Sequence, residues 1–281
     1  MAFARRLAIL PGGLGGLGSS IGKRLRAEGA KLAILYAPFE ADRRDELLHA
    51  GYHDSPKATT ATDIRTYACD ITSPASVQEA FTSLTKEMIS PDLPPNERAV
   101  PSILINTAGY VSLSDMHLTP PEETLKHLTT NVYGPMLCAQ AFANLYFDYT
   151  KTQAAKSSGN EAIVPGRIVN LASKAAHVAL HQHGAYCASK AAVLGLTRCM
   201  ASEWGPRGIT ANTVSPTVAW TELGRKAWGA ERVKEELFSK IPVGRAALPE
   251  EVAEAVAFLC RDSSGMINGT DIKVDGGYTI R

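Results

Sequence analysis

The sequence predicts one α/β domain, built on a doubly wound and mostly parallel sheet with helices on both faces. Short apolar runs of strand length alternate with longer segments of helical pattern, which is typical of parallel sheets with crossover helices. The chain has 281 residues, a length that suits one large domain of this class. No internal repeat and no linker interrupts it, so we expect residues 1–281 to form a single domain.

Composition and charge argue against several classes of protein. The chain is 45% hydrophobic and 20% charged with a net charge of +1, as in ordinary globular proteins. It has no run rich in Lys and Arg, and no apolar run near the ~20 residues that cross a bilayer. Met1–Arg6 resembles the basic start of a signal peptide, but the apolar run Leu7–Leu10 is too short for its core. We therefore expect no nucleic-acid partner, no membrane partner and a cytoplasmic location.

The five cysteines show no C-x-x-C pair and no spacing typical of a metal site. Most lie in apolar stretches, which indicates reduced and mostly buried thiols of an intracellular protein. Cys187 directly follows Tyr186 and is interpreted as a small helix residue in preference to a redox group.

The first elements form a strand, turn, helix and strand in sequence. The apolar run Leu7–Leu10 is followed by a glycine-rich turn, Pro11–Gly18, then by a helical segment that ends at Gly29 and by the strand Leu32–Leu35. Such a unit within ~30 residues is typical of dinucleotide-binding, Rossmann-type domains. The glycines let the backbone approach a pyrophosphate, and the N-terminus of the helix favours its charge. A flexible loop is the weaker alternative, because the turn lies between a strand and a helix.

The end of the second strand bears on the choice of cofactor. An acid there would bind the adenosine ribose 2′-hydroxyl and repel a 2′-phosphate. The chain has Tyr36 and Ala37 instead, and Arg43 and Arg44 a few residues on could reach a 2′-phosphate. The alternative, that both arginines are solvated at the start of a helix, stays open. We expect NADP(H) to be slightly favoured, with NAD(H) as the alternative.

The middle of the chain continues the alternation of strands and helices. Thr66–Thr72 is predicted as a third strand that ends in Asp70, and Ser73–Glu79 starts a helix with a capping residue and an early proline. Ser102–Gly109 is the fourth strand and its exit, where the last two residues are small enough to let a cofactor pass close.

One long helix and two surface loops are expected beyond these strands. Helical signals run from Pro121 to about Tyr149, although Asn131 is mildly unfavourable within a helix. Polar and proline-rich segments predict surface loops near residues 90–101 and 151–165.

A tyrosine and a lysine mark the predicted centre of the chemistry. Tyr186 and Lys190 lie one turn apart on one face of a helix expected over Tyr186–Trp204, and Ser173 ends the strand Gly166–Ala172 upstream. An ammonium nearby favours the phenolate and lowers its pKa, and a serine hydroxyl can hold a carbonyl or alcohol oxygen beside the phenol. The three can move a proton on and off a C–O group while a cofactor moves a hydride. Taken alone, such a pair also occurs by chance on amphipathic helices.

Three histidines lie between the serine and the tyrosine, at His177, His181 and His183. Their spacing matches no pair of metal ligands on a helix or strand, so polar groups of a substrate loop are the favoured interpretation over a metal cluster. Gly208–Pro216 then reads as a sixth strand and its turn.

These motifs, in this order, resemble the short-chain dehydrogenase/reductase family over nearly the whole chain. The resemblance rests on the glycine turn, on Asn106–Gly109 for N-N-A-G, on T-N-V-x-G at Asn131, on Ser173 with the Tyr186/Lys190 pair, and on the turn after the sixth strand. Three positions depart from the pattern. Pro11 replaces a threonine whose hydroxyl steadies the turn, Thr107 stands at the second asparagine, and Thr217 replaces the glycine of P-G.

The resemblance implies a catalytic tetrad with distinct roles. Tyr186 gives or takes the proton, Lys190 lowers its pKa and binds the nicotinamide ribose, and Ser173 holds the substrate oxygen. Asn131 bends its helix locally and supports a water that relays protons. The implied cofactor-binding residues are Gly12, Gly16, Leu17, Gly18, Tyr36, Asp70, Ile71, Asn106, Ala108, Gly109, Tyr186, Lys190, Pro216, Thr217, Ala219 and Thr221. The implied substrate-binding residues are Ser173, His183, Tyr186 and Trp220, and no metal is expected.

Two stretches of the last third, Glu203–Trp228 and Met266–Thr279, resemble members that act on small polyols, such as threitol-type dehydrogenases. We therefore expect hydride transfer between a nicotinamide cofactor and a small polyol or sugar ketone. One alternative is a 3-oxoacyl thioester reductase, for which Arg225 and Lys226 hint at a basic docking patch. The other is a nucleotide-binding sensor without catalysis, against which the intact tetrad argues.

The helices around Tyr133–Tyr149 and Tyr186–Trp204 carry more apolar residues than one sheet face can cover. Members of the resembled family pair these helices across a two-fold axis, in keeping with closed symmetry. We expect a homotetramer, with a homodimer as the alternative.

Overall fold

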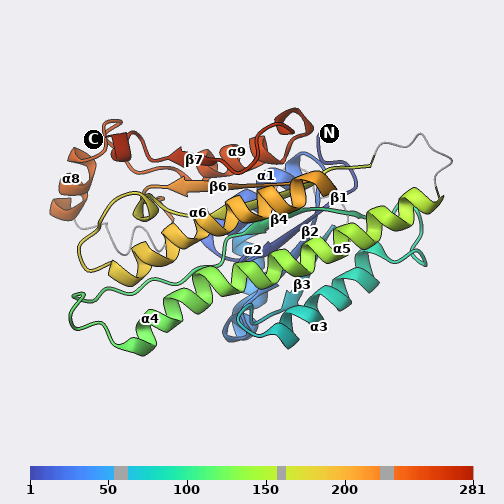
Figure 1. Ribbon diagram of the computed structural model, residues 1–281, viewed down its shortest axis with the longest axis horizontal. Helices are drawn as coiled ribbons and strands as arrows, with labels where there is room; N and C mark the ends of the chain where they lie inside the picture. The colour runs from blue at the N-terminus through green and yellow to red at the C-terminus, as the bar shows by residue number, and fades with distance from the viewer. Residues whose placement is uncertain (54–62, 157–162, 222–230, 281) are drawn as a thin grey trace.

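The computed structural model describes residues 1–53, 63–156, 163–221 and 231–280, and shows one seven-stranded sheet between two layers of helices (Figure 1). Every strand pairs in parallel with its neighbours, in the order β3-β2-β1-β4-β5-β6-β7. The strands are β1 (Arg6–Pro11), β2 (Lys31–Tyr36), β3 (Ile64–Ala68), β4 (Val100–Asn106), β5 (Gly166–Leu171), β6 (Ile209–Pro216) and β7 (Asp271–Val274). The predicted doubly wound α/β fold is confirmed.

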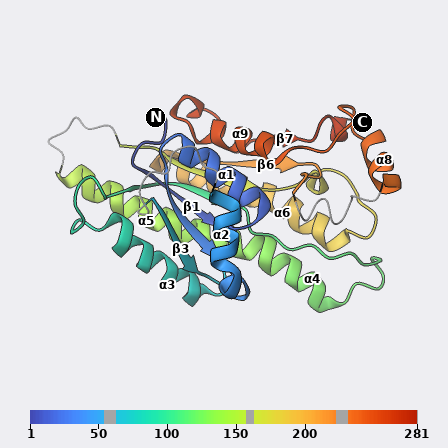
Figure 2. The ribbon, with the colours of Figure 1, turned by 180° about the vertical axis from the view of Figure 1, so that it is seen from behind.

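The helices cover both faces of the sheet. Figure 1 shows α3, α5 and α6 on the near side, and Figure 2 shows α1 and α2 on the opposite side. The helices are α1 (Gly16–Ala27), α2 (Arg44–Tyr52), α3 (Pro74–Leu84), α4 (Pro121–Leu128), α5 (Gly134–Lys156), α6 (Gly184–Trp204), α8 (Glu231–Ser239) and α9 (Pro249–Cys260).

Two hydrophobic cores follow from the alternation of side chains along the strands. In β1, Leu7 and Ile9 join the core beneath α3 and α5, whereas Ala8 and Leu10 join the core beneath α1 and α9. Side chains that alternate between two buried faces explain why the central strands read as continuous apolar runs.

The order of the strands reverses between β1 and β4. The chain winds outward from β1 to β3 and then returns to add β4 on the other side of β1. In open parallel sheets, such a switch point leaves a crevice at the carboxyl ends of the strands, where ligands bind. The fold therefore places the glycine turn after β1 beside the exits of β4 and β5.

Several boundaries differ from the predictions. The helix expected from Pro121 to Tyr149 is divided by a π-helical segment, Thr129–Tyr133, and α5 continues to Lys156. The first six residues of the loop expected near 151–165 are therefore helical, and residues 157–162 lie outside the described part of the chain. The strand β7 was not predicted, since four residues with two polar members give a weak pattern.

No helix in the described part of the chain is both long and apolar enough to cross a membrane.

Candidate active site

Two adjoining cavities lie at the carboxyl ends of the strands. The first has a volume of about 750 Å³ and is lined by the glycine turn, the segment after β2, the exits of β3 and β4, and α4 with its π segment. The second has a volume of about 350 Å³ and is lined by the ends of β5 and β6 and the start of α6. Leu17 and Thr221 line both cavities, so the two adjoin.

The glycine turn shapes one wall of the first cavity. Gly12 has a φ of +79°, and a Cβ atom there would lie 2.7 Å from the Ala108 nitrogen. The helix α1 begins directly after it at Gly16, with Gly15 as an N-cap that offers no side chain, and no acid occupies the first turn. The N–H groups at this helix start are thus left for an anion, and the positive end of the helix dipole favours one. The turn fits a pyrophosphate.

Thr107 supplies a hydroxyl that the turn itself lacks. Its Oγ1 donates to the Pro11 carbonyl at 2.8 Å, and the same carbonyl accepts the Thr107 and Ala108 N–H groups at 3.1 and 3.0 Å. The two departures from the family pattern, at positions 11 and 107, therefore complement each other. Pro11 has no hydroxyl on β1, and Thr107 supplies one from the segment directly after β4.

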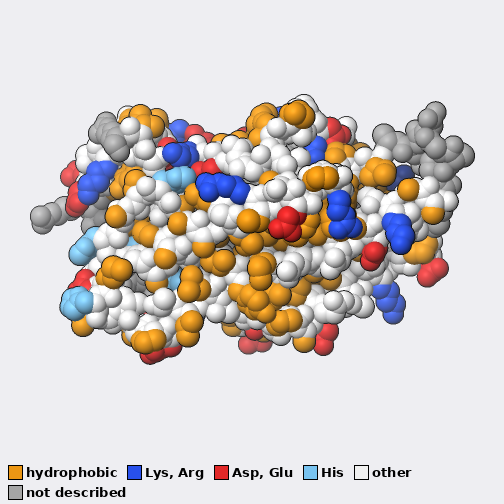
Figure 3. All heavy atoms as spheres, viewed as in Figure 1, with side chains coloured by type: hydrophobic (Ala, Val, Ile, Leu, Met, Phe, Trp, Pro, Cys, Tyr) orange, Lys and Arg blue, Asp and Glu red, His pale blue; other side chains and the backbone are white. Residues whose placement is uncertain are grey.

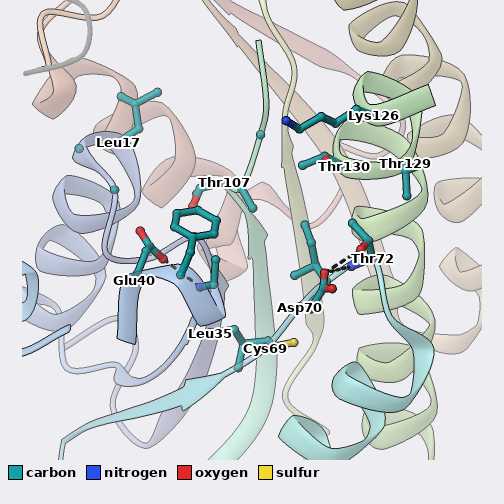
Figure 4. A pocket seen from close by; sticks show the side chains of 18 of the residues that line it. Leu17, Leu35, Glu40, Cys69, Asp70, Thr72, Thr107, Lys126, Thr129 and Thr130 are labelled. Carbon is teal, nitrogen blue, oxygen red and sulfur yellow. Dashed lines mark hydrogen bonds between the residues drawn. The ribbon is translucent and has the colours of Figure 1, made fainter. Parts of the chain in front are cut away.

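The far end of the first cavity holds two carboxylates. Asp70 Oδ1 accepts hydrogen bonds from the Thr72 nitrogen at 2.9 Å and the Thr72 hydroxyl at 2.7 Å. Glu40 Oε2 accepts the N–H of Ala37 at 2.9 Å. Figure 4 shows Glu40 and Asp70 on opposite sides of the cavity, with Leu35 and Cys69 lying between them.

The two arginines expected to reach a 2′-phosphate line neither cavity. Arg43 pairs with Glu46 at 2.9 Å, and Arg44 pairs with Asp45 at 2.8 Å, both on the surface. Tyr36, assigned to the cofactor site from the sequence, is buried at the end of β2 and lines neither cavity. Side chains alternate along a strand, so Leu35 and Ala37 face the cavity while Tyr36 faces away.

Lys190 lies buried behind Gly109. Its Nζ donates to the Leu171 carbonyl at 2.8 Å and lies 5.8 Å from the centre of the Tyr186 ring. Burial lowers the pKa of Lys190 to about 8. Gly109 lines the first cavity, and a Cβ there would lie 3.6 Å from Nζ, so the absence of a side chain leaves the ammonium close to the cavity.

Tyr186 and Ser173 meet at the wall of the second cavity. Burial raises the pKa of the Tyr186 phenol, and a hydrogen bond with the Ser173 side chain offsets part of that rise. The expected fall of this pKa is therefore not produced by the chain alone. The largest cause is desolvation of the buried phenol, which disfavours the charged form. A cationic cofactor beside the ring remains the expected source of the fall.

Asn131 lies in the π segment, where one extra residue per turn bends the helix at a functional site. The π segment lies where the family resemblance implies a local bend, and that role of Asn131 stays a prediction. Its Oδ1 accepts the Tyr110 N–H at 2.7 Å, and its Nδ2 donates to the Tyr110 carbonyl at 2.8 Å and to Ser189 Oγ at 2.9 Å. Both amide N–H groups are used in holding the loop after β4 and the helix α6. The water relay assigned to this residue stays a prediction.

The second cavity combines apolar walls with few polar groups. Val111, Leu113 and Leu180 line it together with His183, whose ring centre lies 6.1 Å from that of Tyr186. Thr217 also lines it, and its buried hydroxyl has no hydrogen-bond partner in the described chain. An unpaired buried hydroxyl fits an amide or hydroxyl of a bound molecule.

The remaining assigned residues divide into two groups. Those that line a cavity are Gly12, Gly16, Leu17, Asp70, Ile71, Ala108, Gly109, Pro216, Thr217, Ala219 and Thr221. Those that line neither are Gly18, Tyr36, Asn106 and Trp220. Asn106 donates to Asn170 Oδ1 at 2.7 Å within the sheet, and the Trp220 ring packs on Phe238.

The three loop histidines do not converge. His177 Nε2 lies 2.8 Å from Asp271 Oδ2, and His183 bonds the His181 carbonyl. Within the described ranges, no group of three His, Cys, Asp or Glu side chains is placed to hold a metal ion.

Glu40 and Thr107 line the first cavity but are absent from the set predicted from sequence. A signal for each exists. Pro38 followed by Glu40 is the pattern of a helix start whose third residue bonds back to the cap. For Thr107 the signal is a pair of departures from the family pattern. Pro11 stands where the family has a threonine, and Thr107 stands where it has an asparagine.

Comparison with known proteins gives consistent matches over the whole chain. The family model described as enoyl-(acyl carrier protein) reductase matches residues 12–279. The chain is 37% identical over 276 residues to the D-threitol dehydrogenase of Mycolicibacterium smegmatis, covering 98% of the chain and 94% of the relative. It is 33% identical to the NAD-dependent glycerol dehydrogenase of Listeria innocua, with coverage of 98% and 94%. A solved short-chain dehydrogenase/reductase from Serratia marcescens has a TM-score of 0.78 and 26% identity, covering 99% of the chain and 100% of that structure.

Proposed function

The chain belongs to the short-chain dehydrogenase/reductase family, and we propose that this nicotinamide-dependent oxidoreductase interconverts a small polyol and the corresponding ketone. Its named relatives include dehydrogenases of D-threitol and glycerol and an L-xylulose reductase, which confirms the reaction class expected from the sequence. The observation that carries the proposal is the placement of Tyr186 and Ser173 together in the wall of the second cavity, with the buried Lys190 Nζ 5.8 Å from the centre of the Tyr186 ring.

The residues of the chain divide the work on the proton. Ser173 holds the substrate oxygen beside the phenol, and Tyr186 takes the hydroxyl proton in oxidation or gives it back in reduction. Lys190 stabilises the phenolate, and Asn131 fixes the loop after β4 and the helix that carries both residues. The nicotinamide, when bound, supplies the acceptor or donor of the hydride.

The shape of the second cavity supports a small substrate. Its volume of about 350 Å³ lies at the lower end of the range for small-molecule sites. Ser173, Tyr186 and His183 offer polar atoms for hydroxyl groups, while Val111 and Leu113 close the other side. A polyol of a few carbons matches this balance.

Two alternatives carry less support. A reductase of 3-oxoacyl thioesters would need a basic docking patch, and the suggested Arg225 and Lys226 lie outside the described residues. A silent nucleotide-binding sensor does not account for the contact between Tyr186 and Ser173 or for the buried Lys190.

We further propose a homotetramer that acts in the cytoplasm. The large apolar side chains Leu128 and Tyr133 are exposed at the end of α4 and in the π segment, outside both cavities, and apolar side chains gather over the helices of this face in Figure 3. A second copy that covered this face would remove that area from water. Light scattering at micromolar protein tests this, and a monomeric mass would refute it.

A substrate screen tests the proposed function. The enzyme is incubated with NAD+ or NADP+ and with glycerol, tetritols, pentitols and hexitols, and reduced cofactor is followed by absorbance. Turnover on short polyols that Tyr186→Phe lacks is the expected result. Cofactor binding without turnover on any alcohol or ketone would favour the sensor instead.

The preference for NADP(H) favoured by the sequence stays a prediction at this point. It rests on the absence of an acid at the end of β2. The fold adds Glu40 to the cavity wall, a carboxylate that lies beyond the strand end.

A further inference from the structure

The carboxylate of Glu40 lines the first cavity but has no role in the proposed mechanism. Glu40 lies in a 3₁₀ segment, Pro38–Arg43, that follows β2. Its carboxylate turns back to the start of this segment, where Oε2 accepts the Ala37 N–H, and its side chain lines the cavity. Figure 4 shows it beside the β2 wall, facing Asp70 across the space.

The position of Glu40 corresponds to one part of a bound dinucleotide. The glycine turn and the start of α1 fit the pyrophosphate at one end of this cavity, and Asp70 with Ile71 lines the other end, where the adenine is expected. The adenosine ribose must join the two. After the end of β2, the cavity is lined by Ala37, Phe39 and Glu40, and of these three side chains only Glu40 is polar.

We propose that Glu40 selects NAD(H) over NADP(H). One carboxylate oxygen is held by the Ala37 N–H, and the other is left to accept a hydrogen bond from a ribose hydroxyl. A 2′-phosphate would place a second negative group against the same carboxylate and would be repelled. The inference rests on the proposed use of a nicotinamide dinucleotide, and it reverses the preference that the sequence favours.

The charges around Glu40 leave this repulsion uncompensated in the described residues. Arg43 and Arg44 are paired with Glu46 and Asp45, and neither arginine lines the cavity. The cation that does line it, Lys126, belongs to α4 and lies with its Nζ 4.2 Å from the centre of the Tyr110 ring. In Figure 4, Lys126 is near Thr130, on the opposite side of the cavity from Glu40.

The geometry also explains why the residues at the end of β2, taken alone, favour NADP(H). In the usual arrangement the acid is the residue at the end of the second strand. Here that place is taken by Tyr36 and Ala37, and the carboxylate comes from a residue farther along that folds back through the capping contact. The acid therefore lies farther along the sequence but still lines the cavity beside the end of β2.

Binding measurements on the full chain, without substrate, test the proposal. Dissociation constants for NAD+ and NADP+ are measured by calorimetry for the parent, for Glu40→Gln and for Glu122→Gln. Glutamine keeps the size of the side chain and its contact with Ala37 but removes the charge. Glu122 lines the same cavity from α4, so its variant is a matched control for loss of a carboxylate there.

The parent is expected to bind NAD+ at least about tenfold more tightly than NADP+. Glu40→Gln should reduce that ratio by about tenfold, mainly through tighter NADP+ binding, whereas Glu122→Gln should leave it unchanged. The parent ratio should also shrink as salt is added, because salt screens like-charge repulsion.

The ratio is measured within one variant, so a partly misfolded sample does not alter it. A parent that prefers NADP+, or a ratio that Glu40→Gln leaves in place, would overturn the role of Glu40. Failure to bind either dinucleotide would instead overturn the proposed function.

Discussion

The two ends of the cleft hold their polar side chains in different ways. At the catalytic end, Asn131 and Lys190 are buried on helices and bonded to distant parts of the chain, namely Tyr110, Ser189 and Leu171. At the adenosine end, the carboxylates of Asp70 and Glu40 accept hydrogen bonds from groups two or three residues away. The catalytic end is therefore fixed by the tertiary fold, and the adenosine end by local turns.

This difference suggests why one end is easier to alter than the other. A proton transfer needs atoms held at hydrogen-bond distance, and buried side chains with many partners provide that. A choice between two cofactors needs only one charge in the right region. Substitutions at the catalytic end should thus change activity and stability together, whereas those at the adenosine end should change selectivity with little cost in stability.

The largest expected effect is the loss of activity in Tyr186→Phe. The variant keeps the ring but has no hydroxyl to carry the proton, so kcat should fall by at least about 10²-fold. The dissociation constant for the cofactor should stay within a factor of about two, since the ring remains. Steady-state kinetics and a cofactor titration check both values.

The control for this variant is Tyr67→Phe, which removes a part-buried hydroxyl bonded to the exposed Glu87, away from both cavities. Its kcat should match that of the parent. In the parent, the rate of alcohol oxidation should rise with pH, because oxidation needs the phenolate and the phenolate is lost as the pH falls. Burial raises the pKa of the phenol, which moves this rise toward higher pH. Retention of more than about a hundredth of the parent rate by Tyr186→Phe would show that another group carries the proton.

The next effect concerns Lys190→Met and the pH dependence of stability. Burial lowers the pKa of Lys190 from 10.5 in its ordinary state to about 8 in the fold. Between these values the unfolded chain keeps a proton that the folded chain releases, so this lysine makes the parent more stable as pH rises through that range. Below pH 8 its buried charge costs up to about 3 kcal/mol.

Methionine carries no charge, so the advantage of the variant should be greatest below pH 8 and should shrink by up to about 3 kcal/mol toward pH 10.5. Urea denaturation without cofactor, at several pH values, measures this difference. Lys86→Met, at an exposed lysine, should show no such pH dependence. A constant difference for Lys190→Met would mean that the lysine is not held as a buried charge.

Asn131→Ala should destabilise the fold by about 2–3 kcal/mol, because it leaves the Tyr110 N–H and carbonyl without partners. Ser189→Ala removes one of the same contacts, so a double-mutant cycle should show a coupling of about 1 kcal/mol between the two positions. Thermal or urea denaturation gives these values. Asn144→Ala, exposed on α5, is the matched control, and an equal loss there would contradict a specific role for Asn131.

The smallest effect is expected for Thr107→Val at the glycine turn. The variant keeps the shape of the side chain but loses the hydroxyl bonded to the Pro11 carbonyl, which still accepts two N–H groups. Stability should fall by about 1 kcal/mol, and the dissociation constant of the cofactor should rise a few-fold. Thr82→Val, which removes an exposed hydroxyl from α3, should change neither. Equal effects in both variants would remove the special role of Thr107.

Sequence patterns predict the fold and the tetrad because both depend on residues close together in the chain or in fixed motifs. The buried strands read as apolar runs, and the pair Tyr186/Lys190 is one helical turn apart. The set assigned to the cofactor is less complete. Glu40 and Thr107 reach the cavity through a folded-back turn and a contact between two strands, and neither relation is visible in one motif taken alone.

Two residues assigned to the site from the sequence, Asn106 and Trp220, line neither cavity for a similar reason. Asn106 and Trp220 were assigned to the site by their place in motifs, but the direction of their side chains depends on packing. Asn106 points into the sheet, where it bonds to Asn170, and Trp220 packs against Phe238. Burial likewise decides the pKa of Tyr186, and the sequence gives no measure of the desolvation that raises it.

The central position of β1 has a consequence for the time course of folding. The glycine turn is held by Thr107 and Ala108, so it is complete only when β4 has returned to pair with β1 from far along the chain. Parallel pairing between distant segments forms slowly, because a long loop must close first. Affinity for the dinucleotide should therefore arise late in refolding, together with the protection of β4 amides from hydrogen exchange. Cofactor binding before that protection would contradict this order.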